Sequence, residues 1–253
     1  MTDPKKQALM APDQMPYYFS TKRTPLEHDY YDILNQPNVD ILDIVNHPIE
    51  SFTERGLQLG GEDAPREFDY VVCATGFDSF TGSLTNMGLT SKDGIDIKDV
   101  WKDGVRTYLG MMFNGFPNAF MVYSPQAPTA LSNGPTIIGK HHPPACTRVT
   151  LTNPKECQCD FVIDTIKAMR AEGSKTIEPT REAEDEWKAG MNAMVEYTLY
   201  PYTDSWWNTS NIPGKKAENQ SYILGINNYE ATCREKMVGW KGFDVVGGKA
   251  VQV

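Results

Sequence analysis

The stretch "FDYVVCATGFD" at residues 68–78 indicates the fold class of this chain. Apolar side chains follow one another from Tyr70 to Ala74 without polar alternation, and Thr75-Gly76 ends the run. Such a run is typical of a strand that is covered on both faces, as in a parallel sheet flanked by helices. We therefore predict a strand over residues 69–75 that needs a hydrogen-bonded neighbour on each side, in a chain of the mixed α/β class.

The segment before this stretch has the pattern of further strands. "NVDILDIV" (38–45) alternates apolar and polar residues and predicts a strand, whereas "IESFTERGLQLGG" (49–61) predicts two short strands around Arg55-Gly56. Residues 1–16 are polar and are predicted to form a weakly ordered lead.

Helical patterns follow in the second half of the chain. Apolar residues recur at helical spacing within 160–171 and again within 181–198, where Thr180 is placed to cap the helix. The stripe of the second helix is interpreted as core packing, and it consists of Trp187, Met191, Met194 and Tyr197. "SWWNTSNIPGKK" (205–216) then predicts an aromatic turn followed by a basic loop.

Composition excludes several classes of protein. The 253 residues include 24 Lys+Arg against 33 Asp+Glu, a net charge of -9 that argues against a nucleic-acid surface. No run of about 18 apolar residues is present, so we expect no membrane span. The polar N-terminus lacks the apolar core of a signal peptide, and the odd count of 5 cysteines favours reduced thiols. We therefore expect a cytoplasmic protein.

Two adjacent cations, Lys22 and Arg23, stand between aromatic clusters in "YYFSTKRTPLEHDYY" (17–31). Lysine supplies a point charge for a phosphate and arginine a planar fork, so the pair suits an anion site. A solvated surface pair is the alternative.

Motifs for self-contained catalysis are missing from the sequence: it has no GxGxxG, GxxxxGK[ST], HExxH or GxSxG. A zinc set is conceivable from His141, Cys146, Cys157 and Cys159. Its cysteines form a CxC rather than a CxxC pair in irregular surroundings, so we expect no metal site.

Five strings in one order extend the argument beyond single motifs. They are "TKRTPLEHDYYDILNQPNVDILDIVNHPIESFTERGLQL", "DYVVCATGFD", "GFPNAFMVYSPQAPTALSN", "EYTLYPYTDSWWNTSNIPGKK" and "GWKGFDVV". The series resembles the C-terminal half of a Baeyer–Villiger monooxygenase. The resemblance implies a partial two-dinucleotide-binding-domain flavoprotein fold with the C-terminal helical part. Residues 17–68 would end the NADP-binding domain and supply linker strands, and 69–253 would form the C-terminal part of the FAD-binding domain with a helical lid.

The resemblance also implies roles for single residues. Arg23 is similar to the active-site arginine that stabilises the negatively charged flavin peroxide, and Lys22 to the lysine that meets the 2′-phosphate of NADPH. Trp206 resembles the tryptophan whose indole N–H reaches the nicotinamide cofactor. Thr75, Gly76 and Asp78 match the segment that joins the two nucleotide-binding domains.

Further positions match the substrate side of the family. Thr129, Ala130 and Leu131 resemble the loop that lines the substrate pocket. Ser124 departs from the family, which commonly has Gly before this Pro; the added hydroxymethyl group would crowd the flavin or be tolerated by a small shift.

The implied activity is oxidation of a ketone to an ester or lactone with FAD, NADPH and O₂, and the setting we expect for it is fungal secondary metabolism. The glycine fingerprints of both cofactors lie outside these residues, so we expect the chain alone to bind FAD poorly, and a complementing N-terminal chain would be required. The alternative is a flavin-free remnant that acts as a binding module, a subunit of a split enzyme, or a non-functional fragment.

One insertion interrupts the family pattern. Residues 136–138 and 156–166 predict one continuous helix if "GKHHPPACTRVTLTNPK" (139–155) is removed. A long irregular loop with Pro143-Pro144 inside a helix is unfavourable, so we interpret the segment as a translated intron; the dipeptide Gly139-Lys140 can be encoded by a splice-donor-like string. An mRNA that always retains these codons would contradict this interpretation.

Overall fold

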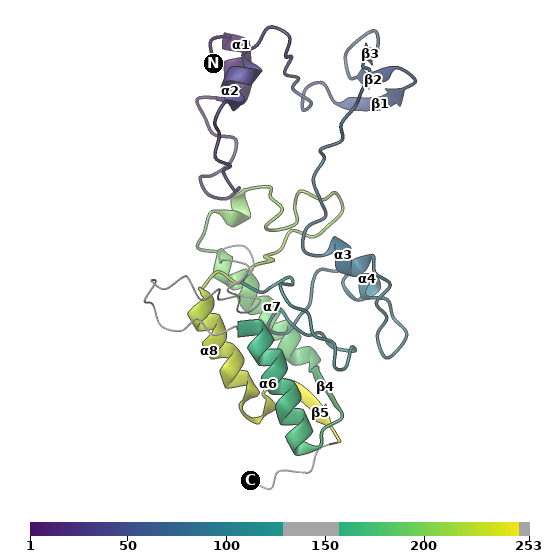
Figure 1. The fold of residues 1–253 in the computed structure, drawn as a ribbon, viewed down its shortest axis with the longest axis vertical. Coiled ribbons are helices and arrows are strands. Elements are labelled where there is room, and N and C mark those ends of the chain that lie inside the picture. Colours follow the sequence, from purple (N-terminus) through teal and green to yellow (C-terminus); the bar gives the residue numbers. More distant parts are fainter. Residues whose placement is uncertain (129–156, 248–253) are drawn as a thin grey trace, which may run out of the picture. The chain divides into compact units, whose positions relative to one another are not determined.

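The computed structural model describes residues 1–128 and 157–247. It divides the chain into two compact units, Met1–Gly76 and Phe77–Val253. The first unit contains two short helices and a three-stranded sheet, and the second contains the longer helices and a two-stranded sheet (Figure 1). The chain is therefore mixed α/β, as predicted.

The first unit begins with helix α1 (Pro4–Met10), within the predicted weakly ordered lead. The Asp3 side chain caps this helix by accepting from the backbone N–H groups of Lys5 and Lys6, at 2.8 and 3.3 Å. Proline in the first turn completes the local start signal, because its fixed φ suits a helix N-terminus. Helix α2 (Tyr30–Leu34) follows.

The sheet of the first unit joins β1 (Ile49–Thr53), β2 (Gly56–Leu59) and β3 (Arg66–Glu67) in antiparallel order. The prediction of two short strands around Arg55-Gly56 is confirmed. A Cβ at Gly56 would lie 1.8 Å from the Arg66 carbonyl oxygen, so only glycine fits this close pairing.

The strands predicted for 38–45 and 69–75 are absent from the structure, and both predictions are wrong for this chain. Residues 69–77 make no backbone hydrogen bond to any other described residue. Their side chains face solvent, since Tyr70, Val72 and Phe77 are 90, 86 and 87 % exposed. An extended segment becomes a strand only through a ladder with neighbours, and the described residues supply none here.

In its described part, the second unit carries three longer helices beside a small sheet (Figure 1). The strands β4 (Thr176–Pro179) and β5 (Phe243–Val246) pair antiparallel, with Ile177 opposite Val245. The longer helices are α6 (Cys157–Glu172), α7 (Arg181–Val195) and α8 (Ile226–Met237). The shorter elements are α3 (Gly82–Thr85), α4 (Ile97–Val100), η1 (Tyr200–Tyr202) and η2 (Val238–Trp240).

Helix α7 confirms most of its prediction. The Thr180 hydroxyl oxygen accepts from Ala183 N–H at 3.2 Å, and Met191 is completely buried. Trp187 packs its indole on the Tyr222 ring, with centroids 5.7 Å apart. Tyr197 does not share this stripe: the helix ends at Val195, and the Tyr197 side chain is 96 % exposed.

The main core of the second unit is formed by the loop 108–112 and the inner faces of the helices. Helix α6 contributes Phe161 and Met169, but Ile166, another apolar residue at the helical spacing noted for 160–171, is 38 % exposed. The fully buried members of this core include Leu109, Met111, Met112, Ile177, Met191 and Tyr229.

Buried Glu184 on α7 predicts a pH dependence of stability. Burial raises the pKa of this carboxyl group, and the Asn114 N–H, which donates to it at 2.6 Å, and Arg181 only partly oppose the shift. The folded state therefore binds the proton more tightly than the unfolded state, so Glu184 lowers the free energy of unfolding progressively as pH rises above about 4.5. Glu184→Gln keeps the acceptor oxygen. Denaturant unfolding at several pH values should show a smaller loss of stability for the variant; parallel profiles would contradict the prediction.

Candidate functional site

The two adjacent cations of the first unit follow a tight turn. The Thr21 hydroxyl donates to the Tyr18 carbonyl oxygen at 2.5 Å, and this turn presents the next two side chains. Lys22 Nζ lies 5.0 Å from the centroid of the Tyr17 ring, a cation–π contact, and Lys22 is half-buried. Arg23 is exposed. The pair therefore combines a positioned ammonium group with an exposed arginine.

The predicted linker residues divide between the two units. Thr75 and Gly76 end the first unit, and both are exposed. Gly76 has φ +85°, in the left-handed region that favours glycine. Asp78 belongs to the second unit, where it has a defined partner.

An ion pair ties Asp78 to the basic loop after the aromatic turn. Lys215 Nζ lies 2.5 Å from Asp78 Oδ2, and it also donates to the Thr81 hydroxyl at 2.6 Å. The Thr81 hydroxyl in turn donates to Asp78 Oδ1 at 3.1 Å. This network connects the start of α3 to the loop 209–216 and fixes where that loop lies.

Trp206 lies in a row of aromatic rings. Its ring stacks on Phe80 and on Trp207, with centroid distances of 5.6 and 4.6 Å. Trp207 is 5 % exposed and continues the row to Tyr200, at 5.4 Å. Stacking on two sides restricts the Trp206 indole, which is half-buried, so its position is set by the protein.

A hollow of about 360 Å³ lies beside this network. Its buried wall includes Trp101, Val105, Glu218 and Gln220. Lysine side chains from α4, from the segment after it and from the basic loop line the opening.

Glu218 in the buried wall of the hollow belongs to a buried ion pair that sequence patterns do not reveal. Lys188 Nζ lies 2.8 Å from Glu218 Oε2, and their side chains are 12 and 4 % exposed. Glu218 Oε1 also accepts from Val105 N–H. A Cβ at Gly104 would lie 2.5 Å from Glu218 Oε2, and its φ is +108°, so glycine is required there. The pair therefore holds α7, the 104–105 turn and the 217–220 segment together.

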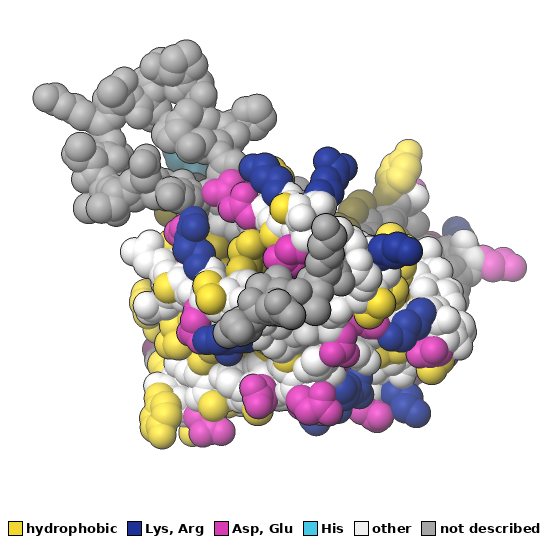
Figure 2. All heavy atoms as spheres, turned by 90° about the horizontal axis from the view of Figure 1, so that it is seen from below, with side chains coloured by type: hydrophobic (Ala, Val, Ile, Leu, Met, Phe, Trp, Pro, Cys, Tyr) yellow, Lys and Arg dark blue, Asp and Glu magenta, His cyan; other side chains and the backbone are white. Residues whose placement is uncertain are grey.

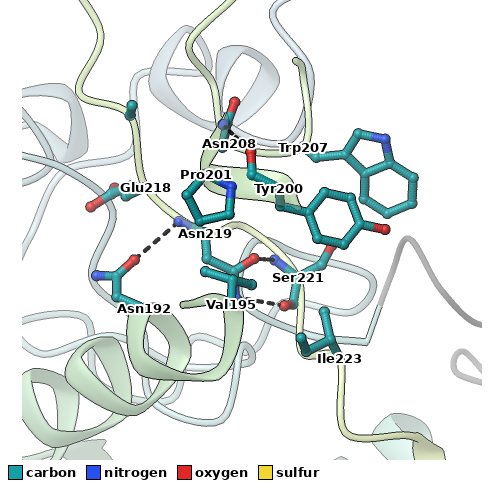
Figure 3. A pocket seen from close by; sticks show the side chains of 11 residues that line it. Asn192, Val195, Tyr200, Pro201, Trp207, Asn208, Glu218, Asn219, Ser221 and Ile223 are labelled. Atoms are coloured by element: carbon teal, nitrogen blue, oxygen red, sulfur yellow. Dashed lines mark hydrogen bonds between the residues drawn. The ribbon is translucent and has the colours of Figure 1, made fainter. Parts of the chain in front are cut away.

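A second cavity, of about 320 Å³, lies between the end of α7, η1 and the 217–223 segment (Figure 3). Asn219 fixes its wall, because its N–H donates to Asn192 Oδ1 at 3.0 Å and its side-chain amide donates to the Ser221 carbonyl at 2.9 Å. Val195, Pro201, Trp207 and Ile223 make the lining largely apolar. This cavity suits an apolar group and offers no arrangement for acid–base chemistry.

Ser124, the departure from the family pattern, is accommodated without a free hydroxyl group. Its side chain is buried, and its hydroxyl donates to the Gly110 carbonyl oxygen. A Cβ at Gly110 would lie 2.6 Å from Ala127 N, and its φ is +62°, so this close approach requires glycine.

Some predicted residues lie outside the described part of the chain. They are the pocket residues Thr129, Ala130 and Leu131, the insertion 139–155, and His141 and Cys146 of the conceivable zinc set. Among the described residues, no cluster of His, Cys, Asp or Glu has the arrangement of a metal site. No helix in the described part is long and apolar enough to cross a membrane.

Comparisons with known proteins identify relatives over almost the whole chain. Cyclopentanone 1,2-monooxygenase of a Comamonas strain is 36 % identical over 244 residues, 96 % of this chain. The chain is homologous to part of the Baeyer–Villiger monooxygenases. It spans about two fifths of its relatives, 41 % of this one, which agrees with the expected C-terminal half. No protein-family model matches the chain.

Other Baeyer–Villiger and FAD-binding monooxygenases support the same conclusion. The FAD-binding monooxygenase VdtE of the fungus Byssochlamys spectabilis is 38 % identical over 91 % of this chain and 38 % of its own length. A closed crystal structure of cyclohexanone monooxygenase superposes with a TM-score of 0.79 and 31 % identity, over 98 % of this chain and 42 % of that one. The predicted resemblance to part of these monooxygenases and the predicted partial fold are confirmed.

A solved relative, OTEMO, forms a complex with FAD and NADP. It superposes with a TM-score of 0.79 and is 28 % identical over 97 % of this chain and 42 % of that one. A dinucleotide cradle needs a parallel strand, a glycine turn and a helix N-terminus. The described residues form only antiparallel sheets, and the sequence has no GxGxxG. The residues present therefore do not fit a complete FAD or NADPH cradle, although they include candidate contacts at Lys22, Arg23 and Trp206.

Proposed function

We propose that this chain supplies one side of the active site of a Baeyer–Villiger monooxygenase, which converts a ketone to an ester or lactone with FAD, NADPH and O₂. The observation that carries the proposal is the 36 % identity to cyclopentanone 1,2-monooxygenase over 96 % of the chain. Ketone oxidation is named in that relative and in cyclohexanone 1,2-monooxygenase, which is 34 % identical.

Within this function, three residues would face the cofactors. Arg23 provides a permanent planar charge for an anionic reactant, and Lys22 provides a point charge for the 2′-phosphate of NADPH. Trp206 would present its indole N–H to the nicotinamide cofactor from the aromatic row. Thr129, Ala130 and Leu131 are proposed for the ketone pocket.

The exposed segment 69–77 supports a requirement for further polypeptide. Its backbone makes no hydrogen bond within the described residues, and its apolar side chains face solvent. A polypeptide with parallel strands and the two cofactor cradles would pair this backbone and cover these apolar side chains. It would lie either upstream in one chain or in a separate subunit. Without such a polypeptide, the chain is a flavin-free remnant.

The genomic and transcript sequence upstream of Met1 tests the proposal. An in-frame segment that encodes a GxGxxG turn after a strand pattern is the expected result for a monooxygenase. A stop codon with no such segment, together with no second gene that restores ketone oxidation on co-expression, would contradict it.

A further inference from the structure

The hollow beside α4 is lined by four lysines in a chain whose net charge is -9. They are Lys98, Lys102, Lys215 and Lys216. The first lies on α4, the second just after it, and the other two on the basic loop that Asp78 ties in place. Two separate segments therefore direct cations to one hollow.

The charges of this hollow do not cancel. Lys215 is paired with Asp78 at 2.5 Å, and Glu218 is paired with Lys188 at 2.8 Å. The remaining lining charges have no ion pair among the described residues, and they are Lys98, Lys102 and Lys216 against Asp99. Three lysines against one aspartate leave an excess of two positive charges, which matches a phosphate dianion.

The buried wall offers a hydrogen-bond acceptor that lacks a donor. Gln220 lines the hollow and is 0 % exposed, and its Oε1 has no partner in the described part of the chain. Its Nε2 donates to the Glu218 carbonyl oxygen at 3.4 Å, so the side chain is held while the oxygen stays unpaired. A buried acceptor without a donor is costly, and a bound N–H or O–H group would satisfy it.

We propose that this hollow binds a small phosphate-bearing molecule whose other end carries an N–H or O–H donor. The phosphate lies at the lysine opening, because ammonium groups act as point charges for phosphate. The donor lies at Gln220 in the buried wall. The volume, about 360 Å³, falls within the range of about 300–1,000 Å³ that small-molecule sites occupy.

Calorimetric titration of the full 253-residue chain with inorganic phosphate and with adenosine 5′-monophosphate tests this site. The double variant Lys102→Ala/Lys216→Ala should bind both probes at least tenfold more weakly. Added salt should weaken the binding of both probes to the parent chain. Lys167→Ala is the matched control, since this lysine is 72 % exposed on α6 and does not line the hollow. Gln220→Leu should weaken the binding of adenosine 5′-monophosphate and leave the binding of inorganic phosphate unchanged.

The proposal is overturned if neither probe shows saturable binding to a chain whose circular dichroism is helical. It is also overturned if the double variant keeps the parent affinity, or if Lys167→Ala loses as much affinity as the double variant. Equal weakening of both probes by Gln220→Leu would contradict the proposed orientation. Because neither probe needs a flavin, failure of this test leaves the proposed monooxygenase function untouched. Failure of the monooxygenase test likewise leaves this binding site untouched.

Discussion

Replacing Lys188 by alanine is expected to lower the free energy of unfolding by about 3–5 kcal/mol, because Glu218 would remain buried as an unpaired charge. The Glu218 side chain is only 4 % exposed, so solvent cannot replace the ammonium group that lies 2.8 Å away. Denaturant unfolding followed by circular dichroism measures the loss.

A paired replacement separates the lost charge partner from lost packing. Lys188→Met/Glu218→Gln removes both charges and keeps an acceptor for Val105 N–H, so it should recover most of the stability that Lys188→Ala loses. If Lys188→Ala costs less than about 1 kcal/mol, as exposed pairs do, the pair is not a structural element of this fold.

Arg23→Ala should reduce the rate of ketone oxidation by about 10²–10³-fold, the usual loss when one charge-stabilising group is removed from an active site. The assay uses this chain co-produced with the cofactor-binding part of a relative, the share that the chain does not cover. Arg23→Lys should recover only part of the rate, because an ammonium group lacks the planar fork.

Lys22→Ala is the neighbouring control for that experiment. It should raise KM for NADPH far more than it lowers kcat, since a contact to the 2′-phosphate contributes to binding rather than to the reaction. An Arg23→Ala rate within threefold of the parent rate would contradict the catalytic assignment of Arg23.

Local patterns predicted the parts of the fold that satisfy their own contacts. The Thr180 cap, the buried face of α7 and the hairpin around Gly56 depend on neighbours in sequence or on the core of the same unit. The strand at 69–75 failed because its ladder partners are not among the described residues.

The candidate site was predictable only in part. The residues of the family motifs, such as Lys22, Arg23 and Trp206, could be named from the strings that carry them. The Lys188–Glu218 pair and the hollow beside it could not, because the pair joins positions that are 30 residues apart and the hollow joins segments that lie between Asp78 and Gln220 in the sequence. The only sequence signal for the hollow was the basic end of "SWWNTSNIPGKK", which gives no partner.

The most direct test asks whether this chain holds a flavin by itself. The chain has candidate contacts to the cofactors but no glycine cradle to hold them. Purified chain titrated with FAD should therefore show no stoichiometric quenching of flavin fluorescence. Co-production with a polypeptide that carries the GxGxxG cradles should yield a complex with one bound flavin. Stoichiometric FAD on the 253-residue chain alone would contradict the conclusion that it forms only one side of the site.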